Sequence, residues 1–368
     1  MKIAVLVSGG VDSSVALALL KAAGHDLTAF YLKIWLEDEL SFLGECPWQT
    51  DLQYAQSVCQ QLDVPLEVIS LQREYHETVV SYTVAEVAAG RTPNPDILCN
   101  SRVKFGFFLD RVADQFDAVA TGHYAQVQRN GDGVRMLQAP DSIKDQTYFL
   151  SHLTQQQLQK ALFPIGHLTK SEVRAAAQEY DLATKERKDS QGICFLGKFK
   201  FREFLAHHVG ERVGEIREHE TGMVLGKHNG FWFYTIGQRQ GLGLAGGPWY
   251  VVNKDVENNI VFVSRHYHTA EKLRNQFHVS DLSWINGAAQ NGSELYVKVR
   301  HGAQRYRCEI VETDAGLQVR IAENDQGLAP GQFAVFYRDN ECLGGGVITK
   351  TAHEMSTDHF QERVSVVR

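Results

Sequence analysis

The first strand-to-helix junction constrains the fold more than any other part of this chain. A continuous apolar run, KIAVLVS, leads into two glycines, and a helix pattern then runs from Ser13 to Ala23, where Gly24 ends it. A buried strand joined to a helix by a glycine turn is typical of a parallel sheet covered by helices. The ligands of such sheets collect at the carboxyl ends of the strands.

The same alternation of strand and helix patterns continues to about residue 125. Further strands are predicted at TAFYLKIW, PLEVISL and DAVATGHY, and helices over Asp51–Leu62, Tyr75–Ala89 and about 102–116. The stretch RTPNPDILCNS holds two prolines and is predicted to be a loop. Beyond it, AQVQRNGDGVRMLQ predicts a hairpin, and Thr169 with Glu172 forms a capping box that opens a helix.

The 368 residues are too many for one ordinary core. After about residue 205 glycine, valine and aromatic residues dominate, and long helical periodicity disappears. We therefore predict a doubly wound α/β domain over residues 1–205, followed by two small β-rich domains. The first is placed at 206–268, and the second, at 269–368, is predicted to be a β-barrel.

Composition narrows the class of protein. Hydrophobic residues make up 43% and charged residues 22%, as in soluble globular proteins, and the apolar run at the start is too short for a signal peptide or a membrane span. We expect a cytoplasmic protein with no membrane partner. The net charge of −7 argues against a uniformly basic binder of nucleic acid, DNA included, but basic clusters at 185–202 and 300–307 suit RNA phosphates. Such clusters are equally compatible with ordinary solvated faces.

The string SGGVDSS lies at the first strand-helix junction. Backbone N–H groups and a helix dipole favour phosphate there, the hydroxyls of Ser8, Ser13 and Ser14 are donors for its oxygens, and Asp12 is a candidate ligand for Mg²⁺. The string lacks the lysine of a Walker loop. It resembles the PP-loop of the ATP pyrophosphatases, which split ATP between the α and β phosphates. That resemblance alone does not separate sulfur transfer to tRNA from amide synthesis.

Two of the six cysteines have chemical surroundings. Cys99 precedes Arg102 and Lys104, and Cys194 lies between basic residues, so both thiols are expected to be reactive. Asp96 is placed to handle a proton near Cys99. Two thiols suit sulfur transfer, because one carries a persulfide and the other resolves the product as a disulfide. The other four lack such neighbours: Cys46, Cys59, Cys308 and Cys342.

A longer series of motifs makes the resemblance specific. RTPNPDILCN, ATGHY, KDQTYFL, KSEVR, DSQGICF, YTIGQRQGLG and PGQFAVFY, in this order, resemble the MnmA family of tRNA-uridine 2-sulfurtransferases over nearly the whole chain. Val7 and Thr147 are small departures from the family pattern. The resemblance implies that ATP adenylates the C2 oxygen of the wobble uridine at position 34, and that sulfur then replaces this oxygen. It also implies two partners, a tRNA and a protein that donates persulfide sulfur.

The resemblance assigns roles to individual residues. Cys194 would carry the persulfide, Cys99 would be the nucleophile, and Asp96 the general acid or base. The residues implied for ATP are Leu6, Val7, Ser8, Gly9, Gly10, Val11, Asp12, Ser13, Leu32 and Gly122. Those implied for the target base are Asn94, Pro95 and Asp96, and those for other tRNA contacts are His123, Lys144, Asp145, Gln146, Arg305, Tyr306 and Gln332. Mg²⁺ would accompany ATP, with no resident metal site.

Two other functions remain open at this point. An ammonia-using ligase of the same fold would adenylate a small molecule and would not need two reactive cysteines. A non-catalytic tRNA-binding protein with a relic nucleotide loop would bind tRNA without releasing pyrophosphate.

Overall fold

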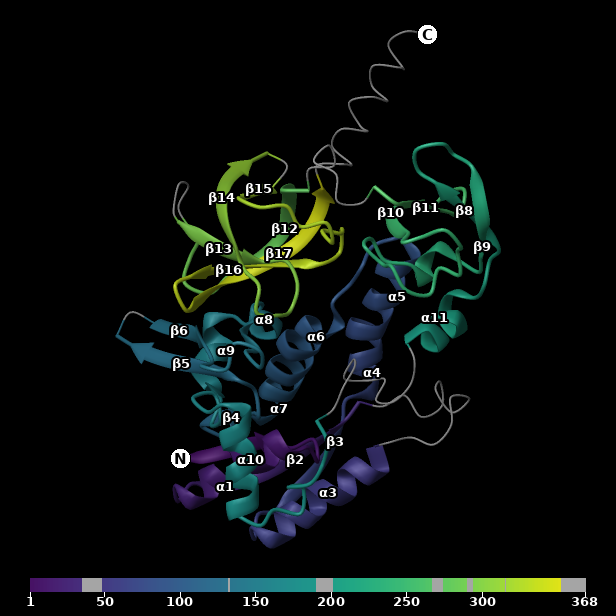
Figure 1. The fold of residues 1–368 in the computed structure, drawn as a ribbon. Coiled ribbons are helices and arrows are strands. Elements are labelled where there is room, and N and C mark those ends of the chain that lie inside the picture. Colours follow the sequence, from purple (N-terminus) through teal and green to yellow (C-terminus); the bar gives the residue numbers. More distant parts are fainter. Residues whose placement is uncertain are drawn as a thin grey trace.

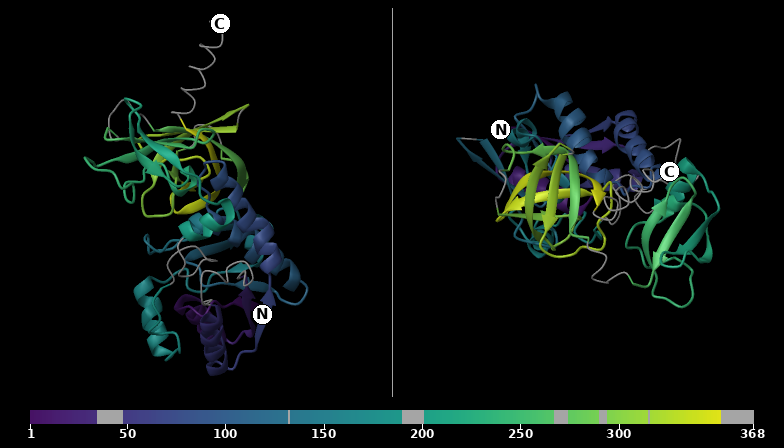
Figure 2. Two further views of the ribbon diagram at one scale, coloured as in Figure 1. Left: turned by 90° about the vertical axis from the view of Figure 1, so that its right-hand side faces the viewer. Right: turned by 90° about the horizontal axis from the view of Figure 1, so that it is seen from above.

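The computed structural model describes residues 1–34, 48–131, 133–189, 201–266, 274–289, 294–314 and 316–351. An α/β domain forms one end of the molecule, and two β-rich parts form the opposite end (Figure 1). Seen from above, the two β-rich parts stand apart from each other: the barrel lies over the α/β domain, and the middle part lies to one side (Figure 2). The predicted fold class, a parallel α/β sheet followed by two β-rich domains, is confirmed.

The α/β domain is built on a five-stranded parallel sheet with the order β3-β2-β1-β4-β7. Alternate residues of β1 enter two different cores: Ile3 and Val5 pack on one face of the sheet, and Ala4 and Leu6 on the other. The domain is therefore covered on both faces, as a doubly wound sheet requires. The strands are β1 (Lys2–Leu6), β2 (Asp26–Lys33), β3 (Leu66–Ser70), β4 (Ala118–Ala120) and β7 (Ala161–Leu162).

The helices predicted after the first strand, at Asp51–Leu62, at Tyr75–Ala89 and after Thr169 are present, with shifted ends. The capping box at the start of α10 is present, since Thr169 accepts from the backbone of Glu172 and the Glu172 side chain accepts from Thr169. Among the described residues, no helix is long and apolar enough to cross a membrane. The helices are α1 (Val11–Ala22), α3 (Trp48–Gln61), α4 (Gln72–Tyr75), π-helical η2 (His76–Val80), α5 (Ser81–Ala88), α6 (Pro95–Leu98), π-helical η3 (Cys99–Phe108), α7 (Leu109–Val112), α8 (Thr147–Leu150), α9 (Gln155–Lys160), α10 (Lys170–Glu179) and α11 (Phe201–Val209).

The prediction of a loop throughout RTPNPDILCNS is wrong. Only its first part is irregular, because α6 begins at Pro95 and continues into η3, which begins at Cys99. Pro95 is at the first helical position, where its missing N–H costs no hydrogen bond and its fixed φ suits the helix. The two prolines therefore mark the start of a helix rather than exclude one.

A four-stranded sheet with the order β10-β11-β8-β9 forms the middle part of the chain. Its small core includes Ile216, Trp249 and Val261, and the 3₁₀ turn η4 (Phe231–Phe233) packs against it. The strands are β8 (Gly214–Glu218), β9 (Val224–His228), β10 (Tyr250–Asp255) and β11 (Ile260–Ser264).

The last part of the chain forms a closed barrel of six strands. The order β12-β15-β14-β13-β16-β17 closes because β17 also pairs with β12. The strands are β12 (Gln276–Trp284), β13 (Leu295–Lys298), β14 (Tyr306–Thr313), β15 (Gly316–Ile321), β16 (Phe333–Arg338) and β17 (Glu341–Thr351).

The predicted hairpin is present as β5 (Ala125–Asn130) and β6 (Gly133–Gln138). It does not join the parallel sheet. Instead β6 pairs with β17 of the barrel, where Met136 stands opposite Cys342. The hairpin thus links the α/β domain to the barrel through one continuous sheet.

Candidate functional site

The nucleotide loop is shaped by close backbone contacts at the carboxyl end of β1. Gly9 has a φ of +71°, and a Cβ there would lie 2.2 Å from the backbone oxygen of Asp51. Only glycine fits this position. The Ser13 hydroxyl accepts from the N–H of Ser8 at 3.1 Å and donates to the Gly10 carbonyl at 3.2 Å. These internal contacts fix the shape of the loop.

The end of β4 presses against this loop. A Cβ on Gly122 would lie 2.6 Å from the backbone nitrogen of Ser13. The structure thus brings Gly122, predicted for ATP, to the start of α1. The next residue, His123, is half-buried and shares a 2.7 Å hydrogen bond with Thr121. Burial, with a smaller contribution from the Lys104 charge, lowers the pKa of His123 well below its ordinary value, so its ring is neutral near pH 7.

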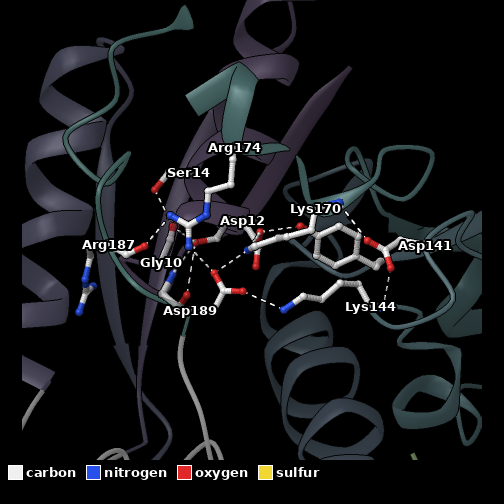
Figure 3. A network of polar contacts seen from close by, with 12 residues as sticks. Gly10, Asp12, Ser14, Asp141, Lys144, Lys170, Arg174, Arg187 and Asp189 are labelled. Carbon is white, nitrogen blue, oxygen red and sulfur yellow. Dashed lines mark hydrogen bonds and ion pairs between the residues drawn. The ribbon is translucent and has the colours of Figure 1, made fainter. Parts of the chain in front are cut away.

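Asp12 is the first carboxylate beyond the loop. It accepts from the Tyr124 hydroxyl and from the Lys170 ammonium, each at 2.7 Å. Lys170 is the first residue of α10, and it also contacts Asp189 at 2.8 Å (Figure 3). One lysine therefore bridges two carboxylates that come from distant parts of the chain.

Asp189 collects three cations. Lys144 contacts it at 2.8 Å, and Lys170 and Arg174 also pair with it. Burial alone would raise the pKa of Asp189, but the hydrogen bonds from Lys144 and Lys170 outweigh it and hold this pKa below the ordinary value. The three cations thus form an anion-binding site, and the Asp189 carboxylate is the anion bound there.

The segment before Asp189 lies across the nucleotide loop. Arg174 donates to the carbonyls of Lys185 and Arg187, and Arg187 donates to the Gly9 carbonyl at 2.6 Å. Arg187 also contacts Asp51 at 2.6 Å. This segment continues in sequence toward Cys194, which lies outside the described residues, as does Cys46.

Cys99 is only 1% exposed and belongs to a large apolar core. The helix predicted from about residue 102 begins instead at Pro95, so Arg102 and Lys104 do not lie in its first turn. The field of a helix N-terminus fades within its first turn. The sequence therefore overstates how far the helix N-terminus lowers the pKa of the Cys99 thiol. The next residue, Asn100, ties this helix to α8, because its side chain donates to the Phe149 carbonyl at 3.0 Å.

Three further cysteines are buried and unreactive in character. Burial raises the pKa of Cys59 to about 11 and the pKa values of Cys308 and Cys342 each to about 12. These thiols are therefore protonated at neutral pH.

The residues predicted to meet the target base lie at the start of α6. Asn94 precedes the helix, and its side-chain oxygen is buried with no hydrogen-bond partner among the described residues. Pro95 is buried and Asp96 half-buried. The Asp96 charge acts on His301 of the barrel, so the structure brings this segment to the junction of the two domains.

Asp145 is 1% exposed and forms a buried ion pair with Lys298 of β13 at 3.0 Å. In this arrangement it holds the KDQ loop in place, with Lys144 and Gln146 on either side. Gln146 accepts from the backbone of Tyr124 at 3.0 Å, so the loop is also tied to the residue that contacts Asp12.

The barrel residues predicted to contact tRNA differ in their access to solvent. Arg305 is exposed and borders a cavity of about 610 Å³, which Ser142 and Lys298 also line. Tyr306 is buried, and its hydroxyl donates to Asp325 at 2.7 Å. Gln332 has a buried side-chain oxygen without a partner among the described residues. Arg305 thus lies near the KDQ loop, whereas Tyr306 faces the barrel interior.

Sequence reasoning missed several residues of this site. In the sequence, four of them stand only within motifs or a basic cluster and have no assigned role: Tyr124, Lys170, Arg187 and Asp189. Lys170 could have been predicted as a site residue from its position, because it begins a capped helix in an α/β domain. His301 carried no signal beyond its place between two arginines.

The fold and the loop at the end of β1 define a nucleotide-binding α/β domain with two β-rich domains attached. Residues 1–198 match the family model described as tRNA methyl transferase HUP domain. Residues 202–265 match the tRNA methyl transferase PRC-barrel domain, and residues 274–348 the Aminomethyltransferase beta-barrel domain.

Curated relatives narrow the class further. The tRNA-specific 2-thiouridylase MnmA of Parabacteroides distasonis is 45% identical over 95% of this chain and 99% of its own length. The protein of the same name from Porphyromonas gingivalis is 43% identical, again over 95% of this chain and 99% of its own length. The chain belongs to the MnmA family of tRNA-specific 2-thiouridylases.

Proposed function

We propose that this protein is an ATP-dependent tRNA 2-thiouridylase that acts on the wobble uridine at position 34. One observation carries the proposal: Arg187 donates to Gly9 of the nucleotide loop, so the segment that leads to Cys194 lies on the predicted ATP site. This contact supports a site in which nucleotide activation and sulfur delivery occur close together.

In the proposed reaction the uridine C2 oxygen attacks the α phosphorus of ATP, and pyrophosphate leaves. The terminal sulfur of the Cys194 persulfide then attacks C2, and AMP leaves. Cys99 finally attacks the Cys194 sulfur, which breaks the sulfur-sulfur bond to the product and forms a Cys99–Cys194 disulfide. Asp96 moves the proton at the base, and a thiol reductant resets the two cysteines.

The structure supports a nucleotide site at the proposed residues. Gly9 and Gly122 let neighbouring backbone segments pack closely against the loop and so fix its shape. Lys144, Lys170 and Arg174 already hold an anionic group beside the loop. Asp12 is the candidate for Mg²⁺ that arrives with ATP. The described residues contain no cluster of three or more metal-ligating side chains that would hold a resident ion.

The buried Cys99 bears on the order of events. Its thiol has to become accessible before it can attack, so we infer that α6 and η3 shift when tRNA and ATP are both bound. The tRNA contacts are assigned to Asn94, His123, Lys144, Gln146, Arg305 and Gln332. Asp145 and Tyr306, being buried, are assigned an indirect part through the loops that they hold.

We also propose the domain boundaries 1–205, 206–268 and 269–368, a cytoplasmic location and a persulfide-donating partner protein. The hairpin β5–β6 supports a close union of the first and third domains, since it belongs to one by sequence and to the other by strand pairing.

The test is to incubate the purified protein with unmodified tRNA, Mg²⁺, ATP and a persulfide source, then to digest the RNA and examine its nucleosides by mass spectrometry. We expect 2-thiouridine, and its loss in C99S and C194S but not in the matched control C308S. Pyrophosphate release without 2-thiouridine, at the same rate in C99S as in the wild type, would favour an ammonia-using ligase. Binding of tRNA without pyrophosphate release would favour a non-catalytic protein, and a methylated base would favour the activity in the name of the HUP family model.

A further inference from the structure

Two aromatic rings stack at the junction of the α/β domain and the barrel. Phe149 belongs to α8, and His301 lies in the barrel segment that follows β13. Their centroids are 4.5 Å apart and their planes differ by 25°, so the rings are nearly parallel. Such stacked contacts add to the stability of a pair beyond the area that it buries.

The ring pair lies beside the proposed catalytic residues. Asn100, next to Cys99 in sequence, donates to the Phe149 carbonyl at 3.0 Å, and this bond ties the pair to η3. His301 Nε2 shares a 3.2 Å hydrogen bond with the Asp145 carbonyl and is thereby fixed to the KDQ loop. The Asp96 charge also acts on His301. Two of the predicted segments, RTPNPDILCN and the KDQ loop, therefore meet at this pair.

The two rings differ in exposure. Phe149 is half-buried, whereas His301 is exposed although Phe149 covers one face of its ring. Phe149 stacks on one face of the ring only, and the residue keeps contact with solvent. Burial of part of the side chain lowers the pKa of His301, opposed by the hydrogen bond to Asp145, so the ring is neutral near pH 7. An exposed, neutral and rigidly backed ring is a surface on which a base can stack.

A polar group for the base edge lies close to the pair. The Asn94 side chain hydrogen-bonds Tyr148, whose ring is 6.3 Å from that of His301. The Asn94 oxygen is buried without a partner among the described residues. A buried acceptor costs free energy until a donor reaches it, and uridine carries one such donor at N3.

We propose that His301, backed by Phe149, is the stacking platform that holds the flipped target uridine during adenylation. This inference rests on the proposed function and adds a positioning role that the family motifs did not assign. A base taken out of its strand needs a new stacking partner, and aromatic side chains provide it in many RNA-binding proteins. The ring alone carries this role, and the hydrogen bond of His301 serves only to orient it.

The test separates stacking from hydrogen bonding. H301F keeps a ring and loses the hydrogen bond to Asp145, whereas H301Q keeps a donor and loses the ring. The affinity of each variant is measured for an anticodon stem-loop RNA with uridine at the target position, and for the same RNA with an abasic residue there. We expect H301A and H301Q to bind the uridine RNA roughly 5- to 150-fold more weakly than the wild type, the range for one stacked base.

The same variants should bind the abasic RNA as the wild type does, and H301F should keep most of the affinity for uridine RNA. The matched control is H219A, which removes the histidine of another His–Phe pair, His219 and Phe262, in the middle sheet; its affinities should not change. The inference is overturned if H301Q binds like the wild type while H301F does not, or if H301A weakens both RNAs equally. Wild-type protein that makes no 2-thiouridine would instead refute the proposed function itself.

Discussion

Replacing Lys298 by methionine tests how the barrel is held on the catalytic domain. Lys298 of β13 and Asp145 of the KDQ loop form an ion pair with side chains only 2% and 0% exposed. Asp145 also accepts from Gln138 at 2.8 Å and from Thr147 at 2.9 Å. K298M leaves these neutral donors in place but removes the only cation that the structure pairs with this carboxylate among the described residues.

The expected cost follows from the burial of both groups. Breaking a buried pair from one side leaves an uncompensated charge and destabilises a protein by about 3–5 kcal/mol. The control is R307M in the same barrel, since Arg307 contacts Glu294 at 3.2 Å with both side chains more than 60% exposed. Exposed pairs contribute about 0–1 kcal/mol. The double variant D145N/K298M should regain much of the loss, because it carries no buried charge.

The assay is urea unfolding combined with hydrogen exchange of peptides from β13 and β16, which reports the barrel separately from the other domains. The reasoning is refuted if K298M is no less stable than R307M. It is also refuted if D145N/K298M is no more stable than K298M, because uncompensated charge would then not be the cause.

Three further predictions concern the nucleotide loop, the pH dependence of stability and the buried thiols. G122A should weaken ATP binding by about tenfold or more in calorimetry, because its Cβ would overlap the Ser13 backbone, whereas G131A, with open space around it, should bind normally. Burial, and then the Arg102 charge, lowers the pKa of His152 from 6.5 to about 4. Between these two pH values His152 is protonated in the unfolded chain but neutral in the folded protein, so the free energy of unfolding should fall as the pH is lowered from 6.5 toward 4. The urea midpoint of H152Q should fall less steeply over the same range. Iodoacetamide near neutral pH should leave Cys59, Cys308 and Cys342 unmodified in the native protein, as judged by mass spectrometry of its peptides.

The α/β domain could be predicted because its local signals agree with its fold. The strand-glycine-helix start, the capping box at Thr169 and the turn at NGDG each specify one structure over a few residues. The error at Pro95 has the same local origin, since a proline both ends helices and begins them. Only the burial of Ile97 and Cys99 decides between the two, and burial depends on the rest of the fold.

The polar cluster beside the nucleotide loop could not be predicted in the same way. Asp12, Lys144, Lys170 and Asp189 are separated by up to 177 positions, and no local pattern pairs them. Each lies in a motif that sequence reasoning had noticed. Their union depends on where α10 packs against α1, which is a property of the assembled sheet.

The joining of barrel and catalytic domain follows from three kinds of contact that act at one junction. The β6–β17 pairing extends one sheet across it, the Lys298–Asp145 pair fixes the KDQ loop to β13, and His301 stacks on Phe149. A tRNA bound by the barrel would therefore act directly on the loop that carries Lys144, and Lys144 holds Asp189. Because Asp189 shares Lys170 with Asp12, a shift of this loop would also change the charges around the nucleotide site. The proposed binding of RNA and the proposed activation of ATP are thus linked through the KDQ loop, whose Asp145 pairs with Lys298 and whose Lys144 pairs with Asp189, and K298M should weaken that link as well as the fold.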